Sequence, residues 1–195
     1  MEQQFNEQES LRLIDEMINK VKSDFHESGI SALLWGSVIV VCSLVSLLNL
    51  RLKIPLLEYV WLLTFVAIVP QVIVSVRESK KRRYKTYTDD AMSGIWISFG
   101  IAIFILSFYS GLFAVPHSSA LYLTLYGMPT FATGVTHRFR PMIIGGVICW
   151  VFAIASFFIN STALQLVLFA VAAFVAWLLP GVILRRKYLK AKRHV

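Results

Sequence analysis

The sequence predicts an all-α membrane protein, a polytopic bundle of six transmembrane helices, and three observations lead to this prediction. Hydrophobic residues make up 57% of the 195 positions and charged residues only 15%, against roughly 45–50% and about 25% in soluble domains. Six apolar runs follow one another, each about as long as the ~20 residues that cross a bilayer. Lys and Arg cluster at alternate ends of these runs, and no acidic residue follows Asp90.

Residues 1–29 are predicted to form a cytoplasmic amphipathic helix ahead of the first run. Leu11, Ile14 and Ile18 belong to an apolar stripe with spacings of three and four residues. The polar face is mixed to acidic, whereas a basic face would favour the lipid surface. We therefore expect the stripe to dock on protein, either on the bundle itself or on a second protomer.

The six runs are predicted to form one transmembrane domain, residues 30–184, which a basic cytoplasmic tail follows at residues 185–195. The approximate spans are 30–50, 56–76, 91–114, 118–136, 142–159 and 163–184. The fourth span is the least apolar because Gly, Pro and Thr residues interrupt it. It is kept as a span because its omission would reverse the orientation of its neighbours.

The placement of basic residues predicts the orientation of the bundle. With the N-terminus in the cytoplasm, seventeen of the 19 Lys and Arg residues fall on the inner side and only Arg51 and Lys53 on the outer side. This bias follows the positive-inside rule and predicts that both termini are cytoplasmic. The basic residues expected to contact anionic lipid headgroups are Arg77, Lys80, Lys81, Arg82, Arg83, Lys85, Arg185, Arg186 and Lys187.

The chain also divides into three helical hairpins that resemble one another weakly. Trp35 in the first span has a counterpart 61 residues later in Trp96. Each returning span carries a proline before its basic end, at Pro70, Pro129 and Pro180. This pattern is compatible with a threefold repeat about the membrane normal, or with the ordinary recurrence of Trp and Pro in small helical bundles.

The sequence contains no pattern that indicates an enzyme. No Asp, Glu, Lys, Arg or His lies in the middle of a span, and nucleotide-binding, hydrolase and metalloprotease motifs are absent from the sequence. We therefore expect no catalytic residues, no cofactor, no metal site and no nucleic-acid partner. Cys42 and Cys149 both fall in apolar runs without a CxxC pair, which indicates buried thiols that act as small apolar side chains.

A polar seam in the second and fourth spans is the main candidate for a site. It comprises Gln71 in the second span and Tyr126, Thr130 and Thr133 in the fourth. Such groups are tolerated at membrane depth when they face protein or a water-filled cavity. They either line a pocket or narrow pore for a small solute, or they serve helix packing, which is the more common use of hydroxyls and small residues.

Three further residues or pairs have simpler interpretations. Gly145-Gly146 in the fifth span predicts a close approach between helices. Glu58 and His117 lie at the outer ends of their spans. There they form either an access site for a solute or, more commonly, a solvated rim.

Three segments, Leu33 to Gly36, Tyr84 to Asp89 and Ile143 to Trp150, resemble a family of small six-transmembrane-helix bacterial membrane proteins without an assigned function. The resemblance covers nearly the whole chain. It implies the topology described above and a location in the bacterial inner membrane. It implies no functional residues.

Two hypotheses for function follow from these features. The first is the binding or passage of a small solute or ion through the polar seam. The second is a membrane-embedded regulatory or assembly protein that contacts a partner, or a second copy of itself, through its N-terminal helix and basic loop. The solute, the partner and the oligomeric state are not encoded in any pattern we find in the sequence.

Overall fold

The computed structural model describes residues 28–81, 87–113 and 115–193, and this part of the chain is helical and contains no strand. Five helices are long and apolar enough to cross a membrane. They cover Ile30–Leu52, Pro55–Lys80, Tyr87–Leu112, Arg140–Phe158 and Thr162–Lys190. The predicted class, an all-α membrane protein, is therefore confirmed. The predicted amphipathic helix at residues 1–29 lies almost wholly outside the described residues.

The elements follow the order of the predicted spans. They are α2 (Ile30–Leu52), α3 (Pro55–Glu58), η1 (Tyr59–Leu62), α4 (Leu63–Lys81), α5 (Tyr87–Leu112), α6 (Ser118–Thr136), α7 (Arg140–Phe158), α8 (Thr162–Ala173), η2 (Phe174–Leu178) and α9 (Leu179–Arg193). The helix α6 coincides with the fourth predicted span but is too polar to count among the five apolar helices.

Several helices extend beyond the predicted spans. The span expected to end at Val76 continues as α4 to Lys81, and the one expected to begin at Ala91 begins as α5 at Tyr87. The basic tail predicted from residue 185 is a continuation of α9. Hydropathy marks only the apolar part of a helix, whereas Lys, Arg and Glu are good helix formers and prolong it into the headgroup region.

The turn from α2 into α3 shows how the sequence ends a membrane helix. Lys53 closes α2 in the left-handed conformation (φ 51°), and its N–H donates to the Asn49 carbonyl over 2.8 Å. The Asn49 side chain in turn accepts a hydrogen bond from the Ile54 N–H. Pro55 then occupies the first turn of α3, where its missing N–H leaves no intrahelical bond unmade.

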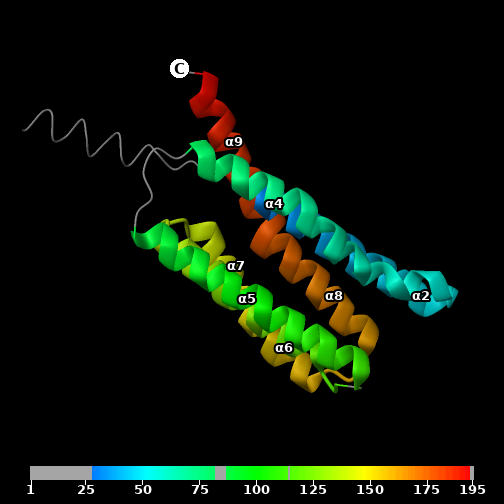
Figure 1. The fold of residues 1–195 in the computed structure, drawn as a ribbon. Helices are drawn as coiled ribbons and strands as arrows, with labels where there is room; N and C mark the ends of the chain where they lie inside the picture. The colour runs from blue at the N-terminus through cyan, green and yellow to red at the C-terminus, as the bar shows by residue number, and fades with distance from the viewer. Residues whose placement is uncertain (1–27, 82–86, 114, 194–195) are drawn as a thin grey trace, which may run out of the picture.

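The helices form two groups that meet in the middle of the molecule (Figure 1). In one group α4 packs on α2, and α2 packs on α8, η2 and α9. In the other group α5 packs on α6, and α6 packs extensively on α7. Contacts of α7 and α6 with α8 and η2 join the two groups. Among the described residues α4 and α5 make no substantial contact with each other, although they follow one another in the chain.

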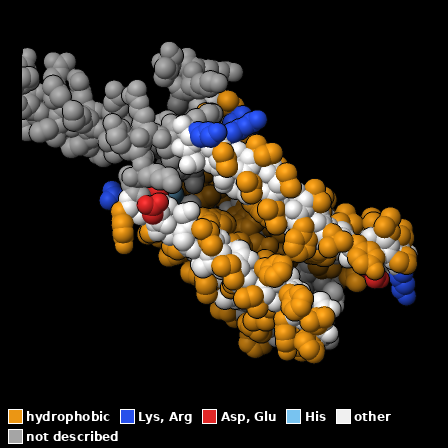
Figure 2. Space-filling view, viewed as in Figure 1, with side chains coloured by type: hydrophobic (Ala, Val, Ile, Leu, Met, Phe, Trp, Pro, Cys, Tyr) orange, Lys and Arg blue, Asp and Glu red, His pale blue; other side chains and the backbone are white. Residues whose placement is uncertain are grey.

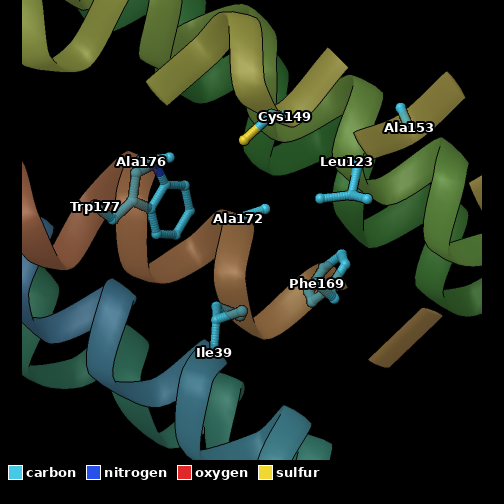
Figure 3. Close-up of a cluster of buried hydrophobic side chains, with 8 residues drawn as sticks. All are labelled: Ile39, Leu123, Cys149, Ala153, Phe169, Ala172, Ala176 and Trp177. Carbon is cyan, nitrogen blue, oxygen red and sulfur yellow. The ribbon is translucent and has the colours of Figure 1, made fainter. Parts of the chain in front are cut away.

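The core lies where the two groups meet (Figure 3). Ile39 from α2, Leu123 from α6, Cys149 from α7 and Trp177 from η2 pack together there and are almost fully buried. Cys149 and the other cysteine of the chain are both buried free thiols, which confirms that they lie inside the bundle as small side chains do.

Glycines allow the central helices to approach closely. A Cβ added at Gly145 of α7 would lie 2.6 Å from the Cα of Ala176 in η2, and one added at Gly134 of α6 would lie 2.6 Å from the backbone N of Ile143. Real Cβ atoms do not approach backbone this closely. The close approach predicted for the glycine pair of the fifth span is therefore confirmed at Gly145.

Candidate functional site

The main hollow of the described structure is a cleft of about 1760 Å³ between α4 and α5. Figure 2 looks into this hollow, with the apolar side chains of the two helices on either side. Residues of α2, α6, α8 and η2 line its inner part. The cleft runs the length of the bundle, from Gly29 and His137 at one end to Glu58 and Asn160 at the other. It exceeds the roughly 300–1000 Å³ of a typical small-molecule pocket.

Aromatic rings form the inner wall of the cleft. Trp96 lies 5.6 Å from Phe99 and 6.5 Å from Trp177 between ring centroids. Tyr126 lies 4.8 Å from Trp177 and 5.6 Å from Phe169, both edge to face. All five side chains line the cleft. Edge-to-face pairs at these separations are the favoured geometry of aromatic rings, so the wall is a connected network.

Two threonines of α6 hold the two inner tryptophans. The indole N–H of Trp177 donates to Thr130 Oγ1 over 2.8 Å, and that of Trp96 donates to Thr133 Oγ1 over 3.2 Å. The Thr130 hydroxyl donates to the Tyr126 carbonyl and the Thr133 hydroxyl to the Pro129 carbonyl. Both threonines are 3% exposed or less. They therefore position aromatic rings rather than face the cleft directly.

The local backbone explains how Trp177 reaches this wall. Trp177 lies in η2, a five-residue π-helix between α8 and α9. Pro180 follows directly and lacks the N–H that would bond to the carbonyl of residue 176 in an α-helix. The π-helical turn widens the helix at this point and turns the indole toward α6. Single π-helical turns are frequent at functional sites.

Gln71 of α4 is the most polar side chain in the middle of the cleft. Its Nε2 donates to Ser31 Oγ of α2 over 3.1 Å and lies 3.4 Å from Ser75 Oγ. Its Oε1 is buried and has no hydrogen-bond partner among the described residues, and the same holds for Ser110 Oγ of α5. Both side chains line the cleft. Both oxygens are therefore unpaired acceptors that lie beneath the surface of the cleft.

The two ends of the cleft are polar. At one end Gln165 Nε2 donates to the Ile159 carbonyl over 2.6 Å, and His117 Nδ1 lies 3.2 Å from the Ser156 carbonyl. At the other end Glu78 accepts a hydrogen bond from the Ser28 hydroxyl. The middle of the described lining contains no charged side chain. The site can therefore hold a largely apolar molecule along most of its length.

The structure brings all four residues of the predicted seam to this cleft. Gln71, Tyr126, Thr130 and Thr133 each belong to its lining. The hydroxyls of Thr130 and Thr133 also have hydrogen-bond partners in neighbouring helices, as the packing alternative predicts. Glu58 and His117 lie at one end of the same cleft. The role of these residues in binding stays a prediction.

Sequence reasoning missed the aromatic wall. Trp35 and Trp96 were noticed only as counterparts in a weak repeat, and both line the cleft together with Trp61 and Trp177. Tryptophans in a membrane protein usually lie in belts at the membrane interface. Trp177 stands fifteen residues after the start of α8, about 22 Å along the helix at 1.5 Å per residue, which is too deep for such a belt. The depth of Trp177 within its span was the feature of the sequence from which the aromatic wall could have been predicted.

The basic residues predicted to contact lipid are only partly described. Arg77, Lys80, Arg186 and Lys187 are exposed. The Arg185 guanidinium lies 5.7 Å from the centre of the Tyr188 ring. Three further residues of the prediction, Arg82, Arg83 and Lys85, and the side chain of Lys81 lie outside the described part of the chain. Lipid contact at these positions stays a prediction.

The described residues contain no group of three or more His, Cys, Asp or Glu side chains that could hold a metal ion. In comparisons with protein-family models, with curated proteins and with solved structures, no match to this chain was found. The resemblance to a family of six-helix bacterial membrane proteins therefore stays a prediction.

Proposed function

We propose that this protein is a multi-pass membrane protein that binds a small lipophilic solute in the cleft between α4 and α5. The observation that supports this most directly is the cleft itself, about 1760 Å³ in volume and walled by a connected network of aromatic rings. Protein interiors leave few voids larger than a water molecule, so a space of this size is built to hold a solute or lipid.

The lining favours an apolar solute over a simple ion. The middle of the cleft presents Trp96, Phe99 and Tyr126 together with a single amide, that of Gln71. An ion crossing a membrane needs a ring of carbonyls or charged groups to replace its water, and the described middle of the lining holds no charged side chain. A solute that already partitions into lipid can enter sideways between α4 and α5.

The length of the cleft supports passage as well as binding. Its lining begins near Gly29 and Glu78 and continues to Glu58 and His117 at the opposite end of the bundle. A solute bound along this path is within reach of both membrane faces. We therefore extend the proposal to movement of the solute along or across the membrane.

The proposed topology has six spans, with both termini in the cytoplasm of a bacterial inner membrane. The helix α6 has the same length, 19 residues, as the apolar helix α7 on which it packs. Its polar residues, among them Thr130 and Thr133, are buried by neighbouring helices rather than presented to lipid. A buried position accounts for a span of low hydropathy.

A matched pair of glycines in α5 tests the proposal. Gly100 lines the cleft, and Gly94, six residues before it, does not. A Cβ added at either position meets no atom within 4 Å. We expect Gly100→Trp to fill the cleft and Gly94→Trp to leave it open, with both variants folding because neither site is packed.

The measurement uses the full chain reconstituted in nanodiscs and a panel of small lipophilic solutes. Binding is followed by tryptophan fluorescence, since four of the five tryptophans line the cleft, and by the shift in melting temperature. We expect at least one solute to bind the wild type and the Gly94→Trp variant but not the Gly100→Trp variant. If no solute binds, or if both variants bind equally, the proposal is wrong.

A further inference from the structure

We infer that the solute this cleft binds is a lipophilic organic cation. The inference rests on the proposed function, since it names the class of molecule that the same cleft takes. Two features of the lining support it: the sign of the charge at the two ends and the aromatic rings between them.

The charge of the lining is opposite to that of the chain. The chain has a formal net charge of +8, yet the described residues that line the cleft include four carboxylates and no Lys or Arg. The carboxylates are Glu58 at one end and Glu78, Asp89 and Asp90 at the other. Arg77 and Lys80 flank Glu78 in α4 without lining the cleft. Asp89 already has an interaction partner, so Glu58, Glu78 and Asp90 are the carboxylates on which this argument depends. Carboxylates at the ends of a groove attract cations and repel anions.

Between the two ends, aromatic rings stand open to the cleft. Trp96 is 37% exposed and Phe104 is 58% exposed, and both line the cleft. The polar edge of Trp96 is already bonded to Thr133, so its ring remains for contact with a ligand. The face of an aromatic ring is negative and attracts a cation, most strongly where water is excluded. An anion would meet negative ring faces and carboxylates together.

The charged ends distinguish a cation from a neutral solute. A neutral lipophile would gain from the apolar walls alone and would gain nothing from the carboxylates at the ends.

Two ions of nearly the same shape and opposite charge separate these cases. Tetraphenylphosphonium is a lipophilic cation and tetraphenylborate is the corresponding anion. We would titrate each into the full chain in nanodiscs of zwitterionic lipid, with protein-free nanodiscs as the background. We expect the cation to bind at least tenfold more tightly than the anion, and the Gly100→Leu variant, which occupies space in the cleft without adding an aromatic ring, to weaken this binding.

A second matched pair on α5 tests the aromatic contact. Phe104 lines the cleft, and Phe108, one turn later and 63% exposed, does not. We expect Phe104→Leu to weaken binding of tetraphenylphosphonium severalfold, since it removes a ring and keeps an apolar side chain. Phe108→Leu should leave the affinity unchanged. Equal affinities for the two variants would contradict the aromatic contact.

The outcomes distinguish this inference from the function on which it rests. If the anion or a neutral solute binds as tightly as the cation and Gly100→Leu weakens both, the cleft is a binding site but the inference is wrong. The inference is also wrong if the cation binds unaffected by Gly100→Leu. If neither ion and no solute of the panel binds the wild type, both the inference and the proposed function are wrong.

Discussion

Two regions of the molecule are held together in different ways. The first, which we call the packed frame, consists of α2, α6, α7, α8, η2 and α9, and the second consists of the flanking helices α4 and α5. In the most apolar stretch of Thr162–Lys190, which belongs to the frame, 44% of the residues are buried, against 6% in each flanking helix. The helices of the frame touch backbone to backbone, whereas the flanking helices meet it mainly through side chains.

The glycines show the same difference. In the frame a Cβ at Gly36, Gly134 or Gly145 would collide with backbone atoms of a neighbouring helix. In α5 a Cβ at Gly94 or Gly100 would meet nothing within 4 Å. Without water as a driving force, membrane helices associate through such close contacts and through hydrogen bonds. The frame uses close backbone contacts, together with hydrogen bonds such as that from Trp177 to Thr130.

The flanking helices α4 and α5 rely on interhelical hydrogen bonds. The helix α4 is joined to α2 by the bond from Gln71 to Ser31 and by the bond from Ser28 to Glu78. The helix α5 is joined to α6 by the bond from Tyr122 to Ser107 and by that from Trp96 to Thr133. Interhelical hydrogen bonds of this kind average about 0.6 kcal/mol in membranes. The cleft is thus bounded by the two least buried of the five apolar helices.

The largest effect is expected where the frame is tightest. Gly145→Ala places a methyl group 2.6 Å from the Cα of Ala176, where no flexible side chain can yield. Overpacking of this kind costs about 1–3 kcal/mol. We expect the melting temperature of the Gly145→Ala variant in detergent to fall by several degrees.

The matched control for this variant lies in a flanking helix. Gly100→Ala makes the same change in α5, where the new methyl group meets no atom within 4 Å. Its melting temperature should stay within about a degree of the wild type or rise slightly, because Ala has the higher helix propensity. Equal losses for the two variants would show that the frame and the flanking helices are packed alike.

The next effect concerns the two bonds between threonine and tryptophan. Thr130→Val leaves the Trp177 N–H, which is buried in the frame, without an acceptor, and this should cost about 1–2 kcal/mol. Thr133→Val removes the acceptor of Trp96, whose ring is 37% exposed to the cleft, and should cost less. Melting curves of the two variants test the order. A larger loss for Thr133→Val would place the structural anchor in α5 rather than in the frame.

Much of this fold could be predicted from the sequence because membrane helices are marked by their length. The apolar runs predicted the positions of α2, α5 and α7, and the glycine pair that includes Gly145 predicted a close contact between helices. The ends of the helices were less predictable, since α4 and α9 continue through charged residues that hydropathy cannot score as helix. At these ends the charged residues lower the hydropathy and so predict the end of the span, whereas their helix propensity predicts that the helix continues.

The arrangement of the helices was harder to predict for a physical reason. Consecutive helices joined by a short connection are usually neighbours, yet α4 and α5 stand apart across the cleft. A helix that is apolar on all sides does not reveal which side faces protein. The seam of Gln71, Thr130 and Thr133 was visible as polar residues in apolar runs. Its partners Trp96 and Trp177 were not, because they come from other helices.

The smallest effect on stability is expected at Gln71, and it separates binding from packing. Its oxygen has no partner among the described residues, and its nitrogen makes bonds of 3.1 and 3.4 Å. Gln71→Leu should therefore change the free energy of unfolding by less than about 0.5 kcal/mol while weakening solute binding in the cleft. Gln165→Leu is the comparison, because Gln165 donates to the Ile159 carbonyl at the end of α7 over 2.6 Å. It should cost about 1 kcal/mol. If Gln71→Leu destabilises the protein as much as Gln165→Leu and leaves binding unchanged, Gln71 serves packing alone.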